Sequence, residues 1–489
     1  MEQYIVAIDP GTSKIIAMIA RKEASGKISI LRTEKVDSES AIRRGCIYNV
    51  DAAAEKMGRL INRLNEDYAK PKLRAPIERI YVSIGGQSLH TEHYSIQKQV
   101  EKETIDQRLL NEIEEEIRQY EPELYEVLQI LPPEYYVDGQ LTANPRGVAA
   151  SVIEARYQLI VVSNPNLKTL LRKAIPEKIE IAGYIVAPLA TAAAVLEKKE
   201  KDLGCALVEF GAGVTTVSIY KNGMLRYLVA IPLGGSVITK DICCLNVFDE
   251  EAETLKTTYG NAISNQEDEK KIIIDKELRT EREIEIRNLN TIIEARIDEI
   301  MENVIHQIRE SGYGDSLVSG IVITGGGTML RNLEESFRNK LNKNLRVAYP
   351  IANDTNQPAG YSTIIGMLTL AKEDCVEPHN KKSGWGGIFG GEVKSGQTII
   401  YDPPHDKPKF IDFEEEFKPE QPPVTKTEPE IIKTTQQIKP VTTRVKKGTF
   451  FTETKKKVNT KVEQLINDIF YTAESASDNV NESDNNENN

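Results

Sequence analysis

The sequence is short of cysteine, histidine and long apolar runs, and each shortage argues against a class of protein. The five cysteines among 489 residues are odd in number and scattered, which favours reduced structural thiols over a disulfide framework. They are Cys46, Cys205, Cys243, Cys244 and Cys375. The five histidines show no spacing typical of zinc ligands, and we expect His90 and His93 to lie on a surface strand or loop.

No run of about 18 uncharged apolar residues is present, so we expect no helix that spans a membrane. The N-terminus lacks the basic and then apolar pattern of a secretion signal, which predicts a cytosolic protein. The formal net charge of -12 argues against broad nucleic-acid binding, so no nucleic-acid partner is expected. A chain of 489 residues is too long for one simple core, and two or more domains or lobes are expected.

The stretch Tyr4 to Ala20, YIVAIDPGTSKIIAMIA, is typical of a hairpin with an unusual tip. Backbone N–H groups around a glycine can face a phosphate, hydroxyls can donate to it, and an acid can hold a hydrated divalent cation. The residues that offer these groups are Asp9, Gly11, Thr12, Ser13 and Lys14. An ordinary polar hairpin is the alternative interpretation of this turn alone.

A second hairpin, GCALVEFGAGVTTVSIY from Gly204 to Tyr220, has the same design. Its acid, glycines and hydroxyls are Glu209, Gly211, Gly213, Thr215 and Thr216. Two turns of this kind about two hundred residues apart predict a duplicated lobe that grips one nucleotide from both sides. Asp9 and Glu209 would then hold Mg²⁺ through water.

A third glycine-rich segment runs from Ser319 to Leu330, where a buried strand leads into a triple glycine and a predicted helix. A strand, glycines and a helix N-terminus allow the backbone to approach a flat or phosphorylated ligand closely. The residues concerned are Gly325, Gly326, Gly327 and Thr328. We expect one helix over Asp241 to Tyr259, in which Glu253 and Lys256 share a face as a solvated ion pair.

The folded pattern ends near Ala371, and Pro, Lys, Glu and Thr then dominate an expected disordered linker. An amphipathic helix follows, with apolar residues at helical spacing and lysines upstream or opposite, and it favours an anionic lipid surface over a partner protein. Its predicted membrane residues are Lys455, Lys456, Lys457, Lys461, Val462, Leu465, Ile466, Ile469 and Phe470.

Taken in order, AIDPGTSKI, VEFGAGVTTVSIY and GIVITGGGTML resemble the two phosphate loops and the adenosine loop of FtsA, an actin-like family of bacterial division proteins. The resemblance runs from Tyr4 to about Lys372. LRYLVAIPLGGSVITKDI, EEAETLKTTYG and YSTIIGMLTLA resemble this family more than sugar kinases or chaperone ATPases.

The resemblance implies an α/β, actin-like two-lobed ATPase fold with ribonuclease H-like halves. It also implies an inserted small α+β subdomain, a disordered C-terminal linker and a terminal amphipathic helix. The expected boundaries are 1–86 and 159–202 for the first lobe, with 359–375 returning to it, 87–158 for the inserted filament-contact subdomain, 203–240 and 302–358 for the second lobe core, 241–301 for its subdomain, 376–454 for the linker, 455–471 for the helix and 472–489 for a disordered tail.

The same resemblance implies a function. Mg²⁺ and ATP are expected between the lobes, with Glu253 and Lys256 beside the adenosine, which reverses the solvated-pair interpretation. Self-assembly into a homopolymer, anionic lipid, later division proteins and the FtsZ C-terminal tail are the expected partners, the tail on 241–301. The expected location is the cytoplasmic face of the inner membrane at the division septum. Three basic positions in 241–301 are candidates for an acidic peptide: Arg282, Arg287 and Arg296.

The second turn departs from the DIGGGTTD-like pattern of that family. Glu209 replaces an Asp, Ala212 a Gly and Val214 a Thr. Mg²⁺ tolerates displaced ligands poorly, so we expect ATP binding with at most weak ATPase activity. A soluble kinase or chaperone-like ATPase of the same superfamily, and a scaffold with an inactive nucleotide site, are the alternatives.

Overall fold

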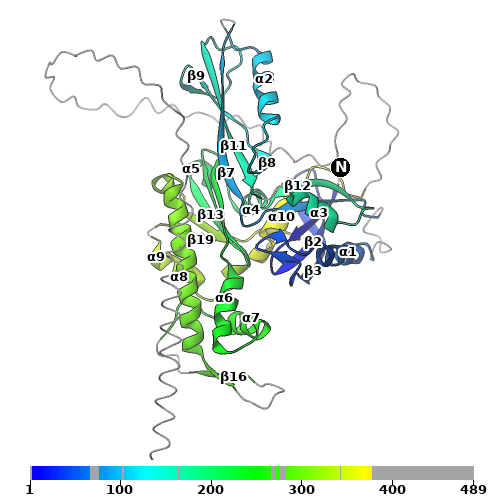
Figure 1. Cartoon of the computed structure of the whole chain (residues 1–489), viewed down its shortest axis with the longest axis vertical. Coiled ribbons are helices and arrows are strands. Elements are labelled where there is room, and N and C mark those ends of the chain that lie inside the picture. Colours follow the sequence, from blue (N-terminus) through cyan, green and yellow to red (C-terminus); the bar gives the residue numbers. More distant parts are fainter. Residues whose placement is uncertain are drawn as a thin grey trace, which may run out of the picture.

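The computed structural model is shown in Figure 1. It describes residues 3–66, 76–101, 104–163, 166–265, 270–274, 282–341 and 343–376. The predicted linker, amphipathic helix and Asn-rich tail after residue 376 lie outside these residues. Within the described part of the chain, none of the helices is both long and apolar enough to cross a bilayer.

The first lobe is a five-stranded sheet with the strand order β12-β6-β1-β2-β3. Strands β1, β2 and β3 form an antiparallel meander, and β6 and β12 run parallel to β1. Helices α1 and α3 pack together, as do α4 and α10. The bounds are β1 (Gln3–Pro10), β2 (Lys14–Lys22), β3 (Ile28–Asp37), α1 (Val50–Glu66), β6 (Arg79–Ile84), α3 (Leu167–Ala174), β12 (Glu180–Val186), α4 (Ala187–Val195) and α10 (Ser362–Leu370).

The second lobe repeats this plan, since β15-β14-β13-β18-β19 has the same order and the same directions. Nearly every residue of its central strands is buried, as expected for a sheet that is covered on both faces. The bounds are α5 (Lys198–Leu203), β13 (Cys205–Phe210), β14 (Thr215–Lys221), β15 (Met224–Ile231), α6 (Gly235–Ile242), α7 (Asp249–Thr258), α8 (Ile286–Glu310), β18 (Ile321–Thr324), α9 (Leu333–Lys340) and β19 (Leu345–Val347).

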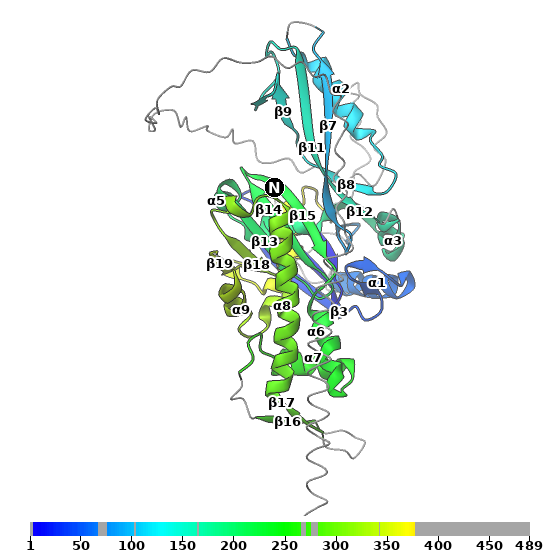
Figure 2. The same ribbon diagram turned by 60° about the vertical axis from the view of Figure 1, so that its left-hand side comes forward.

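A small subdomain projects from the lobes on two long strands, at the end of the molecule opposite β16 and β17 (Figure 2). It contains β7 (His90–Gln99), α2 (Gln107–Arg118), β8 (Glu126–Ile130), β9 (Glu134–Val137), β10 (Gln140–Thr142) and β11 (Val152–Val162), around a core of its own. The chain enters it from β6 of the first lobe. Its sheet, however, continues that of the second lobe, because β7 pairs with β15.

An ion pair reinforces this second-lobe connection. The guanidinium of Arg226 on β15 donates to both carboxylate oxygens of Glu134, at 2.7 and 2.8 Å. The side-chain amide of Gln158 donates to the Arg226 carbonyl at 2.6 Å. The subdomain is therefore joined to one lobe by its chain and to the other by its sheet.

The segment between α6 and α8 corrects two expectations. The single helix expected from Asp241 to Tyr259 is wrong, because α6 ends at Ile242 and α7 begins at Asp249. A 3₁₀ turn, Cys243–Leu245, lies between them, and Asn246 then adopts a left-handed conformation with φ of 61° that stops the helix. The hairpin β16 (Lys271–Ile274) and β17 (Arg282–Glu285) precedes α8.

The second correction concerns a basic residue of this segment. Arg296 on α8 is buried, at 7 % exposure, and pairs with Asp241 and Glu299. A guanidinium that is already paired in the protein interior does not offer itself to an acidic peptide. Arg287 is exposed and lies 3.8 Å from the carboxylate of Glu285, so it stays a candidate.

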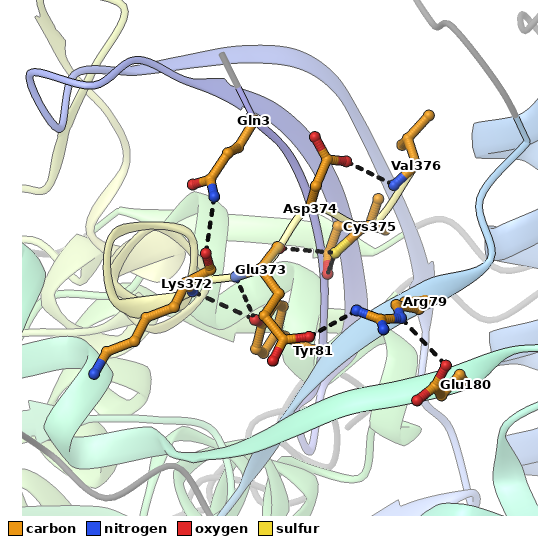
Figure 3. Close-up of polar contacts among 10 residues, drawn as sticks. Gln3, Arg79, Tyr81, Glu180, Lys372, Glu373, Asp374, Cys375 and Val376 are labelled. Atoms are coloured by element: carbon orange, nitrogen blue, oxygen red, sulfur yellow. Dashed lines mark hydrogen bonds and ion pairs between the residues drawn. The ribbon is translucent and has the colours of Figure 1, made fainter. Parts of the chain in front are cut away.

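The last described segment is held at the base of the first sheet (Figure 3). Strands β1 and β6 pair directly at only two positions. Nearer the start of both strands, the backbone of Cys375 lies between them and bonds to each. Its N–H donates to Tyr4, and its carbonyl accepts from Glu78 and Arg79. The Arg79 guanidinium also contacts the carboxylates of Glu180 and Glu373, at 3.2 and 2.6 Å. The sequence after residue 376 therefore starts from a fixed point on the first lobe.

Candidate nucleotide-binding site

The first predicted phosphate turn joins β1 to β2. A β-carbon on Gly11 would lie 2.8 Å from the carbonyl oxygen of Lys14, so the turn is tight enough to require glycine. The carboxylate of Asp9 accepts a hydrogen bond from the hydroxyl of Ser83, at the end of β6, at 2.6 Å. Burial raises the pKa of Asp9, and this hydrogen bond opposes the rise.

The second turn, between β13 and β14, repeats the first in detail. A β-carbon on Gly211 would also lie 2.8 Å from a carbonyl oxygen three residues later, that of Val214. Glu209 precedes Gly211 by two residues, as Asp9 precedes Gly11. Glu209 therefore occupies in the second lobe the position that Asp9 occupies in the first.

Two threonines from helices of the first lobe hold Glu209. The hydroxyls of Thr191 on α4 and Thr363 on α10 lie 3.0 and 2.8 Å from its two carboxylate oxygens. Burial raises the pKa of Glu209 to about 7, against these two hydrogen bonds, and the negative charge of Asp9 adds to the rise. The longer side chain is thus accommodated by donors that connect one lobe to the other.

The two turns meet at Gly213. A β-carbon there would lie 2.3 Å from the hydroxyl oxygen of Thr12, so only glycine permits this approach. Ser13 and Lys14, on the same turn as Thr12, have exposed side chains. Among the predicted residues, the structure brings together the two turns with their acids and glycines and the hydroxyl of Thr12: Asp9, Gly11, Thr12, Glu209, Gly211 and Gly213.

Thr215 is directed elsewhere. Its side chain is fully buried and its hydroxyl donates to the carbonyl of Leu233 at 2.8 Å. Successive residues of a strand point to opposite faces, so Thr215 and Thr216 cannot both face the turns. This alternation of side chains along a strand could have been used with the sequence alone, and selecting both threonines did not take it into account.

The three glycines of the third segment, Gly325 to Gly327, have different structural roles. Gly325 has a φ of 97°, and β-carbons on Gly325 and Gly327 would lie 2.6 Å from the backbone and the ring of Phe210. These two glycines allow the segment to pack against β13. A β-carbon on Gly326 would meet nothing within 4 Å, so Gly326 has open space beside it. Thr328 donates its hydroxyl to the Gly325 carbonyl at 2.8 Å, within a 3₁₀ turn.

Glu253 and Lys256 form the expected ion pair on one face of α7, with Glu253 exposed and Lys256 largely covered. The ammonium of Lys256 lies 2.6 Å from the Glu253 carboxylate and donates to the carbonyl of Gly235 at 3.0 Å. The N–H of Gly235, at the start of α6, in turn donates to Gly211 at 3.0 Å. A chain of hydrogen bonds therefore connects this pair with the second turn. The expected place of the pair beside an adenosine stays a prediction.

Three polar residues that contact the acids were missed from the sequence: Ser83, Thr191 and Thr363. Each is the polar exception in or at the end of an apolar stretch, as in APLATAAAV around Thr191. A buried hydroxyl needs a hydrogen-bond partner, so such an exception is a detectable signal. The sequence does not show which residue is the partner, because Thr363 and Glu209 are 154 residues apart.

Two facing carboxyls with raised pKa values suit a divalent cation, which would favour their charged forms. The described residues contain no group of three or more His, Cys, Asp and Glu side chains that could hold a metal by themselves. This donor set fits Mg²⁺, which keeps several waters and takes one or two carboxylates together with substrate phosphates.

The fold and the paired turns define a class. Two lobes with the same five-stranded topology, each presenting an acid-and-glycine turn to the other, are the architecture of an actin-like protein. The expected fold class, with a small subdomain inserted in the chain between strands of the first lobe, is confirmed.

The family follows from the comparisons with known proteins. The model "Cell division protein FtsA" matches residues 206–366, and "SHS2 domain inserted in FTSA" matches residues 86–161. The cell division protein FtsA of Porphyromonas gingivalis is 34% identical over 339 residues, which cover 68% of this chain and 70% of that protein. That of Bacillus subtilis is 30% identical over 383 residues, covering 76% and 83%. The chain belongs to the FtsA family of cell division proteins, as its motifs predicted.

Two solved structures are similar to this chain at a lower level. A PilM–PilN type IV pilus biogenesis complex has a TM-score of 0.48 at 14% identity, covering 74% of this chain and 97% of that chain. MreB5 of Spiroplasma citri bound to ADP has a TM-score of 0.45 at 12% identity, covering 75% and 95%.

Proposed function

We propose that this chain is an ATP-binding, self-assembling division protein that tethers FtsZ filaments to the cytoplasmic face of the inner membrane and recruits later division proteins. The observation that carries the nucleotide part is the meeting of the two turns at Gly213, with Asp9 and Glu209 on either side. In bound Mg-ATP, the cation would balance the negative charge of the two acids, and the phosphates would accept hydrogen bonds from the turns. Asp9 and Glu209 would hold the cation through water, and the backbone of the turns would hold the phosphates.

The proposed filament contact uses the inserted subdomain. It is joined to the first lobe by its chain and to the second by β7 and β15. A change in the angle between the lobes would therefore act on it from both sides. This gives the nucleotide a route to self-assembly, because ATP would favour the closed arrangement that fits the next subunit.

The FtsZ tail is proposed to bind the segment 241–301. The residues that line a surface groove there include Val247, Phe248, Glu283 and Ile284. The Phe248 side chain is 71 % exposed, which is unusual for a large apolar residue. A partly exposed aromatic residue in a groove is a typical anchor for a bound peptide.

Phe248→Ser tests this contact. Removal of the anchor is expected to weaken binding of an FtsZ tail peptide about tenfold, measured by fluorescence anisotropy with the full chain. Tyr48→Ser is the matched control, because Tyr48 is a similarly exposed aromatic residue, at 61 %, on the first lobe. Equal affinities of the two variants for the peptide would contradict the assignment of the groove.

The membrane contact is proposed to come from the helix at 455–471. Five or six apolar side chains at an interface give a modest, reversible affinity for one chain. Polymerisation would multiply this affinity, because linked helices bind at high effective concentration. A soluble kinase or chaperone-like ATPase, the alternative function, has no use for such a helix.

Deletion of residues 455–471 is therefore expected to release the chain from anionic liposomes in a sedimentation assay, and to leave Mg-ATP affinity unchanged. Deletion of the following residues, 472–489, is the matched control and should leave sedimentation as in the full chain. Unchanged sedimentation after the first deletion would rule out the membrane part of the proposal.

A further inference from the structure

A short hairpin that the sequence analysis did not single out lies beside both phosphate turns. It consists of β4 (Ile42–Arg43) and β5 (Cys46–Ile47), joined by the two residues Arg44 and Gly45. Both of these residues are left-handed, with φ of 47° and 73°. Two successive left-handed residues form a type I′ turn, in which Asn, Asp or Gly normally takes the first position.

The hairpin contacts each of the two turns. The N–H of Gly45 donates to the hydroxyl oxygen of Thr12, on the first turn, at 2.8 Å. A β-carbon on Gly213, on the second turn, would lie 2.8 Å from the Cα of Arg44. The backbone of Arg44 therefore lies where the two lobes present their phosphate turns to each other.

The hairpin is also fixed from behind. A β-carbon on Gly86, just after β6, would lie 2.4 Å from the sulfur of Cys46, and one on Gly45 would lie 3.0 Å from the Cα of Gly86. Such close backbone packing leaves the hairpin little freedom to shift. The position of Arg44 at the turns is thus a property of the fold.

Arginine is a costly choice for this position. A non-glycine residue held in the left-handed region is strained, and strained residues collect at functional sites because the strain serves a purpose there. The Arg44 side chain is exposed and donates to the neutral amide oxygen of Gln87 at 3.2 Å. Neither the turn geometry nor a long hydrogen bond at the surface accounts for a guanidinium here.

We propose that the Arg44 guanidinium releases its hydrogen bond to Gln87 and binds the terminal phosphate of the nucleotide instead. This inference rests on the proposed nucleotide binding and adds a residue to that site. A guanidinium bonds a phosphate more strongly than a neutral amide, because both partners are charged and the contact is often bidentate. Arg44 thereby makes the site prefer a triphosphate over a diphosphate.

Arg44→Asn tests the proposal, because asparagine suits the left-handed turn and removes only the guanidinium. Calorimetric titration of the full chain is expected to show about tenfold weaker binding of Mg-ATP, with Mg-ADP affinity within about threefold of the wild type. A thermal melting temperature at or above that of the wild type would verify that the hairpin is intact.

Arg43→Gln is the matched control. Arg43 carries the same charge one residue earlier, but its guanidinium lies over the ring of Tyr48, 3.6 Å from the ring centroid. Its removal should change both affinities equally, by less than about threefold, because an exposed charge that does not contact the ligand acts only through screened long-range attraction.

Three results would overturn the proposal. The first is an ATP to ADP affinity ratio in Arg44→Asn equal to that of the wild type. The second is an equal loss of affinity for ATP and ADP, which would show that Arg44 does not contact the terminal phosphate. The third is the same loss of ATP affinity in Arg43→Gln, which would show that the loss comes from the lower positive charge and not from a specific contact of Arg44. Wild-type protein that binds neither nucleotide would instead overturn the proposed function.

Discussion

Gly213→Ala is expected to weaken Mg-ATP binding by at least about a hundredfold while the chain stays folded. A β-carbon at this position would lie 2.3 Å from the hydroxyl oxygen of Thr12 and 2.8 Å from the Cα of Arg44. Both distances are far inside van der Waals contact, and one of them involves backbone. The turns would have to separate, so the two halves of the site could not hold the same phosphates.

The loss should be confined to binding, because Gly213 lies in a turn outside the buried hydrophobic clusters of the lobes. Calorimetry measures the affinity, and thermal unfolding verifies the fold. Gly314→Ala is a suitable control, since a β-carbon there would be 3.7 Å from its nearest neighbour atom, an ordinary contact. Near-normal ATP affinity of Gly213→Ala would show that the nucleotide does not bind between the two turns.

Glu209 is expected to make the nucleotide-free protein less stable as pH rises from about 5 to 8. The pKa of Glu209 is raised to about 7 in the folded chain, from an ordinary value of 4.5, so the folded state binds the proton more tightly than the unfolded state. The resulting stabilisation is complete below the unfolded pKa and is lost as pH rises through the folded pKa. Its size is on the order of 3 kcal/mol, because one pKa unit corresponds to about 1.4 kcal/mol.

Glu209→Gln removes the titrating group; its amide oxygen accepts from one of the two hydroxyls of Thr191 and Thr363, and its amide nitrogen can donate to the other. The melting temperature of the wild type, measured in EDTA without nucleotide, should fall by several degrees more than that of the variant between pH 5 and pH 8. The difference between the two profiles is the result to compare, since Asp9 also has a raised pKa. Parallel profiles would contradict the environment described for Glu209.

The paired turns were predictable because all their requirements lie within a few neighbouring residues. An acid, a glycine two residues later and an apolar strand on each side specify the turn at Asp9 and again at Glu209. The duplicated sheets followed from the same repeat. Local chemistry of this kind is readable from one sequence, because turn geometry depends on the residues that form it.

What the sequence did not reveal depends on contacts between distant segments. Thr363 reaches Glu209 only because α10 returns to the first lobe at the end of the folded chain. The sheet that joins the inserted subdomain to the second lobe depends on a pairing between His90 and Val229. Arg44 went unnoticed because two adjacent arginines before a glycine also suit an ordinary surface turn, and its significance lies in what surrounds it.

One error came from a local signal given the wrong meaning. The helix expected over Asp241 to Tyr259 had an acidic Asp249-Glu-Glu run in its middle, which is a typical helix start. The triple glycine has a packing role besides the predicted one, because β-carbons on Gly325 and Gly327 would meet the backbone and the ring of Phe210. Its role as a ligand loop stays a prediction.

Titration of the full-length wild-type chain with Mg-ATP in a calorimeter tests the central claim most directly. The account predicts saturable binding of one nucleotide per chain at micromolar to millimolar concentration, which Gly213→Ala abolishes and Gly314→Ala preserves. Absence of binding by the wild type across that range, with the chain folded, would contradict a nucleotide site between the turns at Asp9 and Glu209.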